Sequence, residues 1–374
     1  MKDKPEPPES SPSGGTCAGR TTMNGKPVLF RKAKTVINVK NEAFKDKRLC
    51  DGIIMNPGDA CAYSCSFCYV GSVQRFLAPP LLKAHTLQHG VKLRFEDVVI
   101  RKKNVFELLR AQLLDRCGRR RYPDDQDHRV VYSSTTVDVA ANMELLRETA
   151  ELCMLILEHT GWQIRLLSKG NLLHKLLEDN MIPERHHQRL IFGFSTGTLD
   201  DRVAKAFERG TALVSKRLES LHWLQDRGLR TFGMICPSLP QEGYDKFSRD
   251  ICSAIRVEKC EHVWAEPINV RGESLSKTLS ALLDAGLEAE AVLLAKVSGP
   301  KTAMAWENYS RETFLAHTRN IPSGKLRFLQ YINPQTADWW TAHIEDGAVL
   351  LGKTAKQLGL TAAPCISKDS ILKA

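Results

Sequence analysis

The stretch that decides both the fold and the chemistry of this chain is Cys61-Ala-Tyr-Ser-Cys65-Ser-Phe-Cys68-Tyr69, which follows the turn-rich residues 56–59. Three thiolates this close do not pair into one disulfide with a sensible remainder, but they are able to bind three irons of a cubane cluster. Such a cluster normally takes four cysteines, and no fourth follows at a ferredoxin-like spacing. Cys61, Cys65 and Cys68 therefore predict a [4Fe-4S] cluster with one iron open to a ligand from outside the protein, as in catalytic metal sites.

The pattern C-x-x-x-C-x-aromatic-C, with Phe67 as the aromatic residue, resembles the signature of the radical S-adenosylmethionine enzymes. The resemblance implies that S-adenosylmethionine binds the open iron. It also implies that an electron from the reduced cluster cleaves this cofactor to a 5′-deoxyadenosyl radical, which abstracts hydrogen from a substrate. In such enzymes the cofactor carries the chemistry, and the protein supplies orientation and exclusion. The structural alternative is a set of three buried or zinc-binding cysteines.

Length and composition favour one large globular domain. A chain of 374 residues suits a single α/β barrel with additions at its ends, and a hydrophobic content of 43% is enough for a sizeable core. No apolar run approaches the ~18 residues of a membrane span. The N-terminus lacks the layout of a secretory signal, and an odd number of cysteines containing a cluster motif fits a reducing compartment. We therefore expect a cytoplasmic protein with no membrane contact.

The formal charge of +10 is concentrated around the cysteine motif. Residues 1–50 carry 11 Lys/Arg against 5 Asp/Glu, and residues 69–129 carry 13 against 7, whereas the chain from residue 130 onward is balanced. Phosphate-rich partners are attracted to such basic regions by counterion release, so DNA or RNA is a candidate partner. The alternative is a solvated basic surface without a partner.

The order of apolar runs predicts an α/β fold. Six strand-like runs alternate with amphipathic helices, at residues 52–55, 130–133, 163–167, 190–194, 230–235 and 262–266. Such alternation favours a parallel sheet with helices outside, and the family resemblance implies an open, partial (β/α)6 barrel. A doubly wound sheet is the alternative. We expect a disordered tail at residues 1–25, a lead-in segment at 26–50, the core domain at 51–272 and a mostly helical C-terminal extension at 273–374.

Polar residues follow several of these strands. Thr136 and Asp138 follow the second, Lys169 the third, Ser195 the fourth and Arg271 the sixth. The carboxyl ends of barrel strands lie at one face, where the site is expected. S-adenosylmethionine presents a carboxylate and hydroxyls that cations and polar groups bind, and Lys169 suits the carboxylate. Singly, such residues are more often helix caps or solvated side chains.

Residues 50–270 resemble more closely the spore photoproduct lyase-like branch of the radical S-adenosylmethionine proteins, whose namesakes split a damaged thymine pair in DNA. The resemblance rests on Asn56-Pro57, Cys68-Tyr69, residues 134–138, Ser168-Lys169 and residues 195–201, with Glu208 and Arg217 downstream. It implies cofactor contacts at Tyr69, Thr136, Lys169 and Ser195. Phe67 and Arg271 complete the set of predicted cofactor-binding residues, and Tyr69 is also a candidate catalytic residue.

The chain departs from the namesake enzymes at two positions. They carry a cysteine after the second strand, where it returns hydrogen to the product radical, and this chain has Ser133-Ser134 there. They have a tyrosine where this chain has Phe67. A serine hydroxyl is a far poorer hydrogen-atom donor than a thiol. Cys117, in the basic stretch of residues 116–121, is a candidate replacement if its loop folds over the site, and a thiol without a role is the alternative.

These observations favour a radical S-adenosylmethionine enzyme, lyase-like, that acts on a nucleic acid base in repair or modification. A reductant such as flavodoxin or ferredoxin is then a further expected partner. The second hypothesis is an enzyme of the same kind that acts on a small molecule or peptide in biosynthesis. The third belongs to another class, an iron-sulfur protein that binds or senses nucleic acid without turnover.

Overall fold

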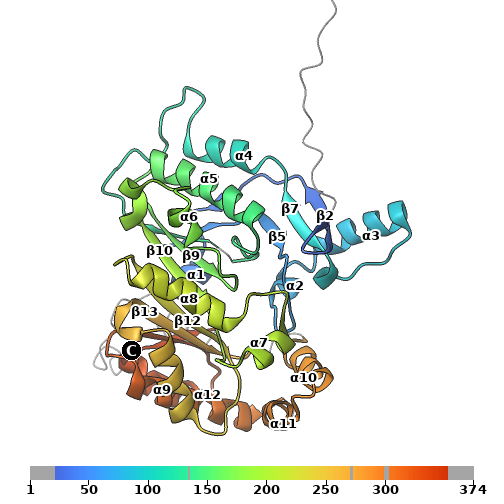
Figure 1. The fold of residues 1–374 in the computed structure, drawn as a ribbon, viewed down its shortest axis with the longest axis vertical. Helices are drawn as coiled ribbons and strands as arrows, with labels where there is room; N and C mark the ends of the chain where they lie inside the picture. The colour runs from blue at the N-terminus through green and yellow to red at the C-terminus, as the bar shows by residue number, and fades with distance from the viewer. Residues whose placement is uncertain (1–21, 134, 270–272, 299–302, 353–374) are drawn as a thin grey trace, which may run out of the picture.

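The computed structural model describes residues 22–133, 135–269, 273–298 and 303–352, and its main feature is a nine-stranded sheet (Figure 1). The strands run in the order β15-β14-β13-β12-β10-β9-β8-β4-β3. Only β3 is antiparallel to its neighbour, and the others run parallel. Their bounds are β3 Ile37–Asn38, β4 Ile53–Met55, β8 Val130–Ser133, β9 Gln163–Ser168, β10 Leu190–Ser195, β12 Thr231–Ser238, β13 Cys260–Pro267, β14 Leu326–Tyr331 and β15 Ala348–Leu351.

The six strands expected from the sequence are β4, β8, β9, β10, β12 and β13, and each lies beside the next in chain order. The prediction of an α/β fold with a parallel sheet is therefore confirmed. Strands β14 and β15 were not predicted. They extend the same sheet beyond β13 by parallel pairing. The long helix α12 (Ala303–Asn320) carries the chain back to the end of the sheet at which the parallel strands begin, as the helix of a βαβ crossover does.

Helices cover one face of the sheet. Buried side chains from the helices pack on this face, around Leu146, Ile156, Leu224 and Phe314. The helices are α4 Val105–Leu113, α5 Met143–His159, α6 Lys175–Glu178, α8 Val214–Gln225, α9 Tyr244–Ala254, α12 and α13 Ala337–Ala342. The amphipathic helix expected between the second and third strands is α5, whose first turn is capped by the Asn142 side chain.

The opposite face of the sheet carries a second apolar cluster that includes Tyr132, Phe232 and Trp264. The short helix α1 (Glu42–Asp46) lies against it. Phe44 contacts the ring of Tyr132, and the Trp264 indole donates to the Lys47 carbonyl at 3.0 Å. Both faces of the strands are thus buried, as their nearly continuous apolar sequences require.

A smaller sheet, not predicted from the sequence, lies beside β4 in the order β1-β2-β7-β5. Its strands are β1 Thr22–Met23, β2 Lys26–Arg31, β7 Val99–Lys102 and β5 Gly58–Ala60. Residues 22–25 therefore correct the predicted disordered tail, because Met23 is buried against Ala62 and Val99. The rest of that tail lies outside the described residues.

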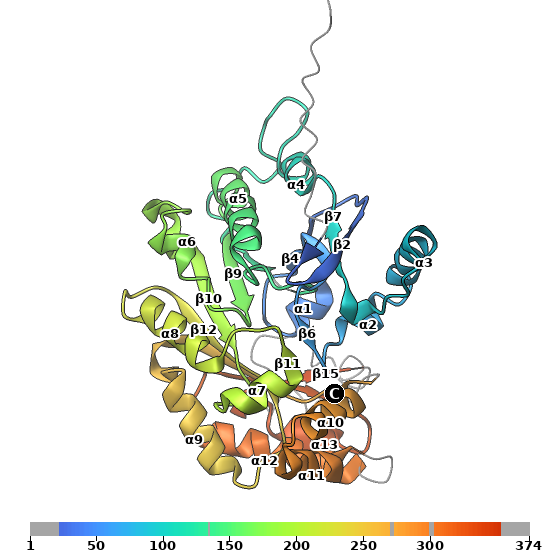
Figure 2. The same ribbon diagram turned by 45° about the vertical axis from the view of Figure 1, so that its right-hand side comes forward.

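The remaining helices surround the carboxyl ends of the parallel strands or project from the body (Figure 2). They are α2 Val70–Val73, α3 Ala78–His89, α7 Asp201–Phe207, α10 Ser274–Asp284 and α11 Glu288–Val297. The first part of the expected, mostly helical C-terminal extension is thus divided into α10 and α11, at the left-handed Gly286. No helix in the described part of the chain has the length and apolar character needed to cross a membrane.

The loop at the amino ends of β8 and β9 gives a prediction about stability and pH. Asp127 accepts hydrogen bonds from Arg129 at 2.8 and 2.7 Å and from the Trp162 indole at 2.7 Å, and the Arg129 bonds lower its pKa to about 2. Its side chain is 17% exposed. Because the folded pKa lies below the ordinary value, the carboxylate stabilises the fold above pH ~4, and this contribution is lost as the pH falls toward 2.

We expect Asp127→Asn to lower the free energy of unfolding by about 2 kcal/mol at pH 7, from chemical denaturation, with a smaller difference at pH 3. Asp125→Asn is the matched control. Asp125 also pairs with an arginine, Arg120, but its side chain is 73% exposed, so no measurable change in stability is expected. A pH-independent effect of Asp127→Asn would contradict this account.

Candidate functional site

The cysteine loop is held between two sheets. Strand β5 of the smaller sheet leads directly into Cys61, and the two-residue strand β6 (Ser64–Cys65) pairs antiparallel with β11 (Glu208–Arg209). Lys26 on β2 donates from its ammonium to the Tyr63 carbonyl at 2.6 Å. The loop therefore has backbone or side-chain partners from both sides, and Figure 2 shows β6, β11 and α2 close together beside the sheet.

All three motif cysteines are free thiols on this loop. The Cys61 sulfur accepts backbone hydrogen bonds from Tyr63 at 3.4 Å and from Asp138 at 3.3 Å. Burial raises the pKa of Cys61 to about 12 and raises that of Cys65 well above its ordinary value. These sulfurs are therefore protonated at neutral pH, and a bound metal centre would have to displace their protons.

Among the described residues, no three His, Cys, Asp or Glu side chains are arranged to hold a single metal ion. In a cubane cluster each cysteine binds a different iron, so its ligands need not converge on one ion. Cys61, Cys65 and Cys68 all lie within eight residues of one loop.

Lys169 lies at the carboxyl end of β9 and faces the cysteine loop. Its ammonium donates to the Ser195 hydroxyl at 3.0 Å, to the Cys236 carbonyl at 2.9 Å and to the Glu208 carboxylate at 2.5 Å. It also lies 5.2 Å from the centre of the Phe67 ring. The structure thus brings together three predicted site residues, Lys169, Ser195 and Phe67, which come from three separate segments.

Glu208 is shared between two cations. Besides Lys169, the Arg217 guanidinium lies 2.6 Å from its carboxylate, and neither Glu208 nor Arg217 is more than 1% exposed. Arg217 also donates to the Ser195 carbonyl at 2.7 Å. Two cations and one carboxylate leave this cluster with one positive charge, so the arrangement suits a further anionic group.

Asp138 connects the cysteine loop to β9. Its buried carboxylate accepts hydrogen bonds from the Ser168 hydroxyl at 2.8 Å, from the Lys169 backbone at 2.7 Å and from the Ala140 backbone at 2.9 Å. Burial raises the pKa of this carboxyl, and the hydrogen bonds oppose that shift. Because its own backbone donates to Cys61, Asp138 fixes Lys169 and Cys61 relative to each other.

Two further predicted residues lie beside the loop but use their hydroxyls internally. Tyr69 donates to the Thr135 carbonyl at 2.6 Å, and Thr136 donates to the Gly58 carbonyl at 2.8 Å. Each bond ties the segment after β8 to the cysteine region. Arg271, the last predicted cofactor contact, lies outside the described residues.

Cys117 is not brought to the cysteine motif. Its loop packs at the other end of the sheet, where Arg120 donates to the His159 carbonyl at the end of α5, just before β9 begins. The neighbouring Arg119 is paired with Asp115 at 2.8 Å. The condition under which Cys117 was a candidate hydrogen donor, that its loop folds over the site, is therefore not met, because Cys117 lies at the amino ends of the strands.

The predicted metal-binding and cofactor-binding residues did not include Lys26, Asp138, Glu208 or Arg217. Asp138 was noted only as a polar residue after the second predicted strand, and Glu208 and Arg217 only among the residues that carry the family resemblance. No local signal identifies Lys26, which belongs to β2 and reaches the loop only through tertiary folding.

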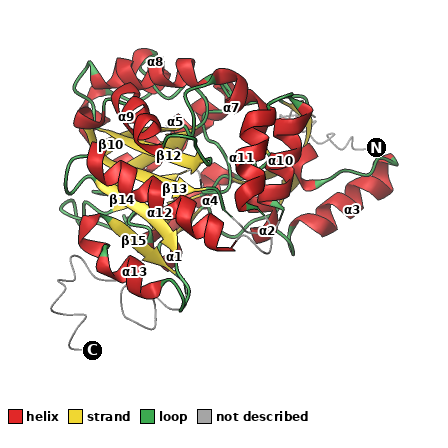
Figure 3. Cartoon of the chain, turned by 90° about the horizontal axis from the view of Figure 1, so that it is seen from below, coloured by secondary structure: helices red, strands yellow, loops and turns green. Residues whose placement is uncertain are grey.

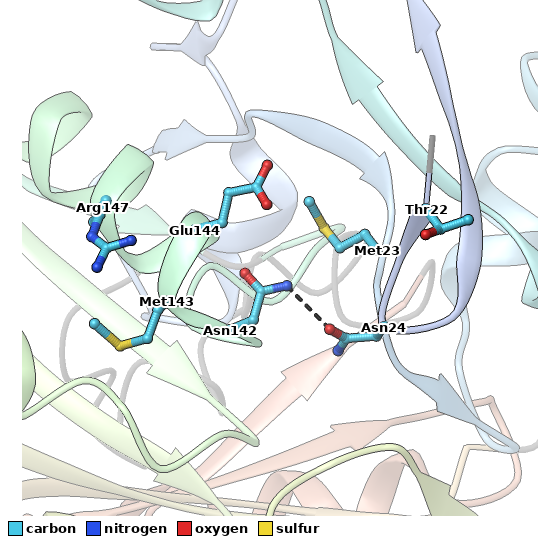
Figure 4. Close-up of a pocket in the computed structure, with 7 residues that line it drawn as sticks. All are labelled: Thr22, Met23, Asn24, Asn142, Met143, Glu144 and Arg147. Carbon is cyan, nitrogen blue, oxygen red and sulfur yellow. Dashed lines mark hydrogen bonds between the residues drawn. The ribbon is translucent and has the colours of Figure 1, made fainter. Parts of the chain in front are cut away.

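A pocket of about 640 Å³ lies next to this region but is not the predicted site (Figure 4). Asn142 donates to Asn24 across it at 3.1 Å. The pocket is lined by Thr22, Met23, Asn24, Asn142, Met143, Glu144 and Arg147. No motif cysteine lines it, and neither does Lys169 or Ser195.

No family model matches this chain, and no curated protein sequence matches it. Among solved structures, it is similar to a tyrosine-to-phenylalanine mutant of spore photoproduct lyase, with 14% identity, a TM-score of 0.43 and coverage of 68% of this chain. That alignment covers 66% of the mutant, slightly less than two thirds of its length.

A second neighbour is spore photoproduct lyase complexed with dinucleoside spore photoproduct, at 13% identity and a TM-score of 0.44, covering 73% of this chain and 80% of that one. A third is a double mutant with bound AdoMet and dinucleoside spore photoproduct, at 13% identity and a TM-score of 0.41, covering 67% of this chain and 74% of that one. The branch inferred from the sequence is thus found among the structural neighbours. Because these TM-scores lie below 0.5, the likeness does not itself define the fold or activity of this chain.

The Glu208 cluster gives a prediction about stability. Glu208→Gln leaves Lys169 and Arg217 without a buried counter-charge, so we expect the free energy of unfolding to fall by about 3–5 kcal/mol. Glu219→Gln is the control, because Glu219 pairs with Lys216 at 2.8 Å but is 62% exposed, and a change within about 1 kcal/mol is expected there. Equal losses in chemical denaturation would show that the buried cluster does not hold the fold together.

Proposed function

We propose that this chain is a radical S-adenosylmethionine enzyme in which Cys61, Cys65 and Cys68 hold a [4Fe-4S] cluster. The observation that carries the proposal is the position of the C-x-x-x-C-x-x-C loop. It lies at the carboxyl end of β4, and the β6–β11 pairing joins it to the cluster of Lys169, Glu208 and Arg217. Motif and polar cluster are thus parts of one site.

The residues present fit the cluster. Three unpaired thiols lie on one loop, and Cys61 receives two backbone N–H groups, which stabilise a thiolate ligand. When bound, the cluster supplies the electron that cleaves S-adenosylmethionine. We further propose that a reductant such as flavodoxin or ferredoxin provides this electron, in a reducing compartment such as the cytoplasm.

The chain's own residues position the cofactor. The net positive charge around Lys169 attracts the carboxylate of the cofactor. Glu208, which Arg217 also binds, holds the Lys169 ammonium in place. The Ser195 hydroxyl, which donates to the Cys236 carbonyl at 2.8 Å, offers its oxygen beside the ammonium. Phe67 covers the ammonium and excludes water from this side.

We propose a partial (β/α)6 barrel geometry for the six strands from β4 to β13, with the site at their carboxyl ends. The chain order of these strands and the loop after β4 support this proposal. For the substrate, we propose a nucleic acid base, in repair or modification. The excess of Lys and Arg before and after the cysteine motif supports a polyanionic partner.

The metal assignment predicts that anaerobically reconstituted protein holds about four irons and four sulfides per chain. Replacing Cys61, Cys65 or Cys68 by Ala should each abolish the bound cluster and the release of 5′-deoxyadenosine. The matched control is Cys153→Ala, because Cys153 is buried in the helix-covered core and far from the motif in sequence. Iron content and turnover that survive the loss of one motif cysteine would remove that cysteine from the site.

The cofactor assignment predicts that Lys169→Ala weakens S-adenosylmethionine binding by about 1.5–3 kcal/mol, the value of a charged hydrogen bond, while iron content stays unchanged. Equilibrium binding to the reconstituted protein measures this effect. Lys216→Ala, which removes an exposed lysine paired only with Glu219, is the control. Unchanged affinity in Lys169→Ala would show that another group binds the carboxylate.

A further inference from the structure

The segment that directly follows the cysteine motif projects from the body as an arm. We use this name for residues 70–94, which contain α2 and α3. Helix α3 extends away from both sheets in all three ribbon views (Figure 3). Its base is fixed by Leu81 and Leu82, which pack on the small cluster around Ala60 and Ile100. Gln74 adds a hydrogen bond to Asp59 at 3.4 Å.

The arm carries cations without any acidic residue. No Asp or Glu occurs between Asp59 and Glu96, whereas the arm contains Arg75, Lys83, Lys92 and Arg94. Arg94 is neutralised by Asp97 at 2.9 Å, and the other three cations lie exposed. This charge disfavours pairing of the arm with a second copy of itself and favours a polyanion.

The arm also exposes apolar side chains to an unusual extent. Among the described residues, four of the ten large apolar side chains that lie exposed belong to the arm, namely Val73, Phe76, Leu87 and Val91. Phe76 is 79% exposed, and the Arg75 guanidinium lies 4.8 Å above its ring. An exposed aromatic ring beside a cation is the arrangement on which unpaired bases stack.

The distribution of these side chains argues against a lipid surface as the partner. A helix that lies on a membrane needs one continuous apolar face. In α3, however, Leu81 and Leu82 face the body, and Leu87 is exposed beside Gln88 and His89. The apolar residues are therefore divided between the anchored base of the arm and single exposed positions.

We propose that the arm binds a single-stranded or locally unpaired segment of nucleic acid, with Phe76 stacking on a base and Arg75, Lys83 and Lys92 contacting phosphates. The choice of nucleic acid rests on the proposed function. The arm starts two residues after Cys68. A nucleic acid strand bound to the arm would therefore lie next to the cysteine loop, on one side of the proposed site.

Fluorescence anisotropy with a labelled single-stranded oligonucleotide of about 15 nucleotides tests the proposal on the full-length chain. We expect Phe76→Ala to raise the dissociation constant about 5-fold or more, and Phe76→Trp to preserve binding. Lys83→Glu should reduce the slope of log affinity against log salt concentration by about one unit or more. Arg227→Ala is the matched control, since Arg227 also covers an aromatic ring, that of Trp223, at 3.7 Å, but lies just beyond the end of α8.

Unchanged affinity in both Phe76→Ala and Lys83→Glu would overturn the proposal, as would an equal loss in Arg227→Ala. Tighter binding to anionic lipid vesicles or to a small acidic protein than to the oligonucleotide would also overturn it. Release of 5′-deoxyadenosine without nucleic acid is measured separately on the reconstituted protein. A result that contradicts nucleic acid binding by the arm is therefore distinguishable from a result that contradicts the proposed enzyme activity.

Discussion

The Glu208 carboxylate, held between Lys169 and Arg217, is the interaction on which the candidate site depends. A buried carboxylate between two cations is stable only while both partners remain in place, because each unpaired charge would have to be desolvated without compensation. Glu208 also belongs to β11, whose partner strand β6 contains Cys65. The ion cluster and the strand pairing therefore act on the same few residues. Together they fix the distance between the cysteine loop and the ends of β9 and β10.

The opposite side of the loop is fixed by different means. The smaller sheet supplies β5, which leads into Cys61, and β2, whose Lys26 binds the loop carbonyl of Tyr63. Met23 packs beneath the loop against Ala62. A loop restrained from both sides presents its thiols in one arrangement, and such preorganisation is what a catalytic metal site requires. The N-terminal segment thus contributes to the site, although Lys26 precedes Tyr63 by 37 residues in the chain.

The arm and the site divide two tasks between neighbouring segments of the chain. Residues up to Tyr69 have partners from several strands, whereas α3 projects from the body, and Phe76 and three cations of the arm lie exposed. A rigid loop suits a metal centre, and an exposed basic surface suits a large polyanion that has to arrive and leave. This division accounts for the concentration of positive charge near a motif whose own residues are almost uncharged.

The sequence by itself determined the parallel strands from β4 to β13 and the cysteine motif. Apolar runs such as residues 190–194 can be buried on both faces only in a covered parallel sheet, and the cysteine spacing is local chemistry that needs no fold to be recognised. Strands β14 and β15 were not predicted, because short apolar runs do not distinguish a strand from a buried helix.

The contacts of Lys26 with Tyr63 and of Glu208 with Lys169 join residues 37 and 39 positions apart. Only the tertiary structure decided them, because burial and strand pairing, and no local pattern, bring such side chains together. The same holds for Cys117. The fold places it at the amino ends of the strands, at the end of the sheet opposite to the cysteine motif.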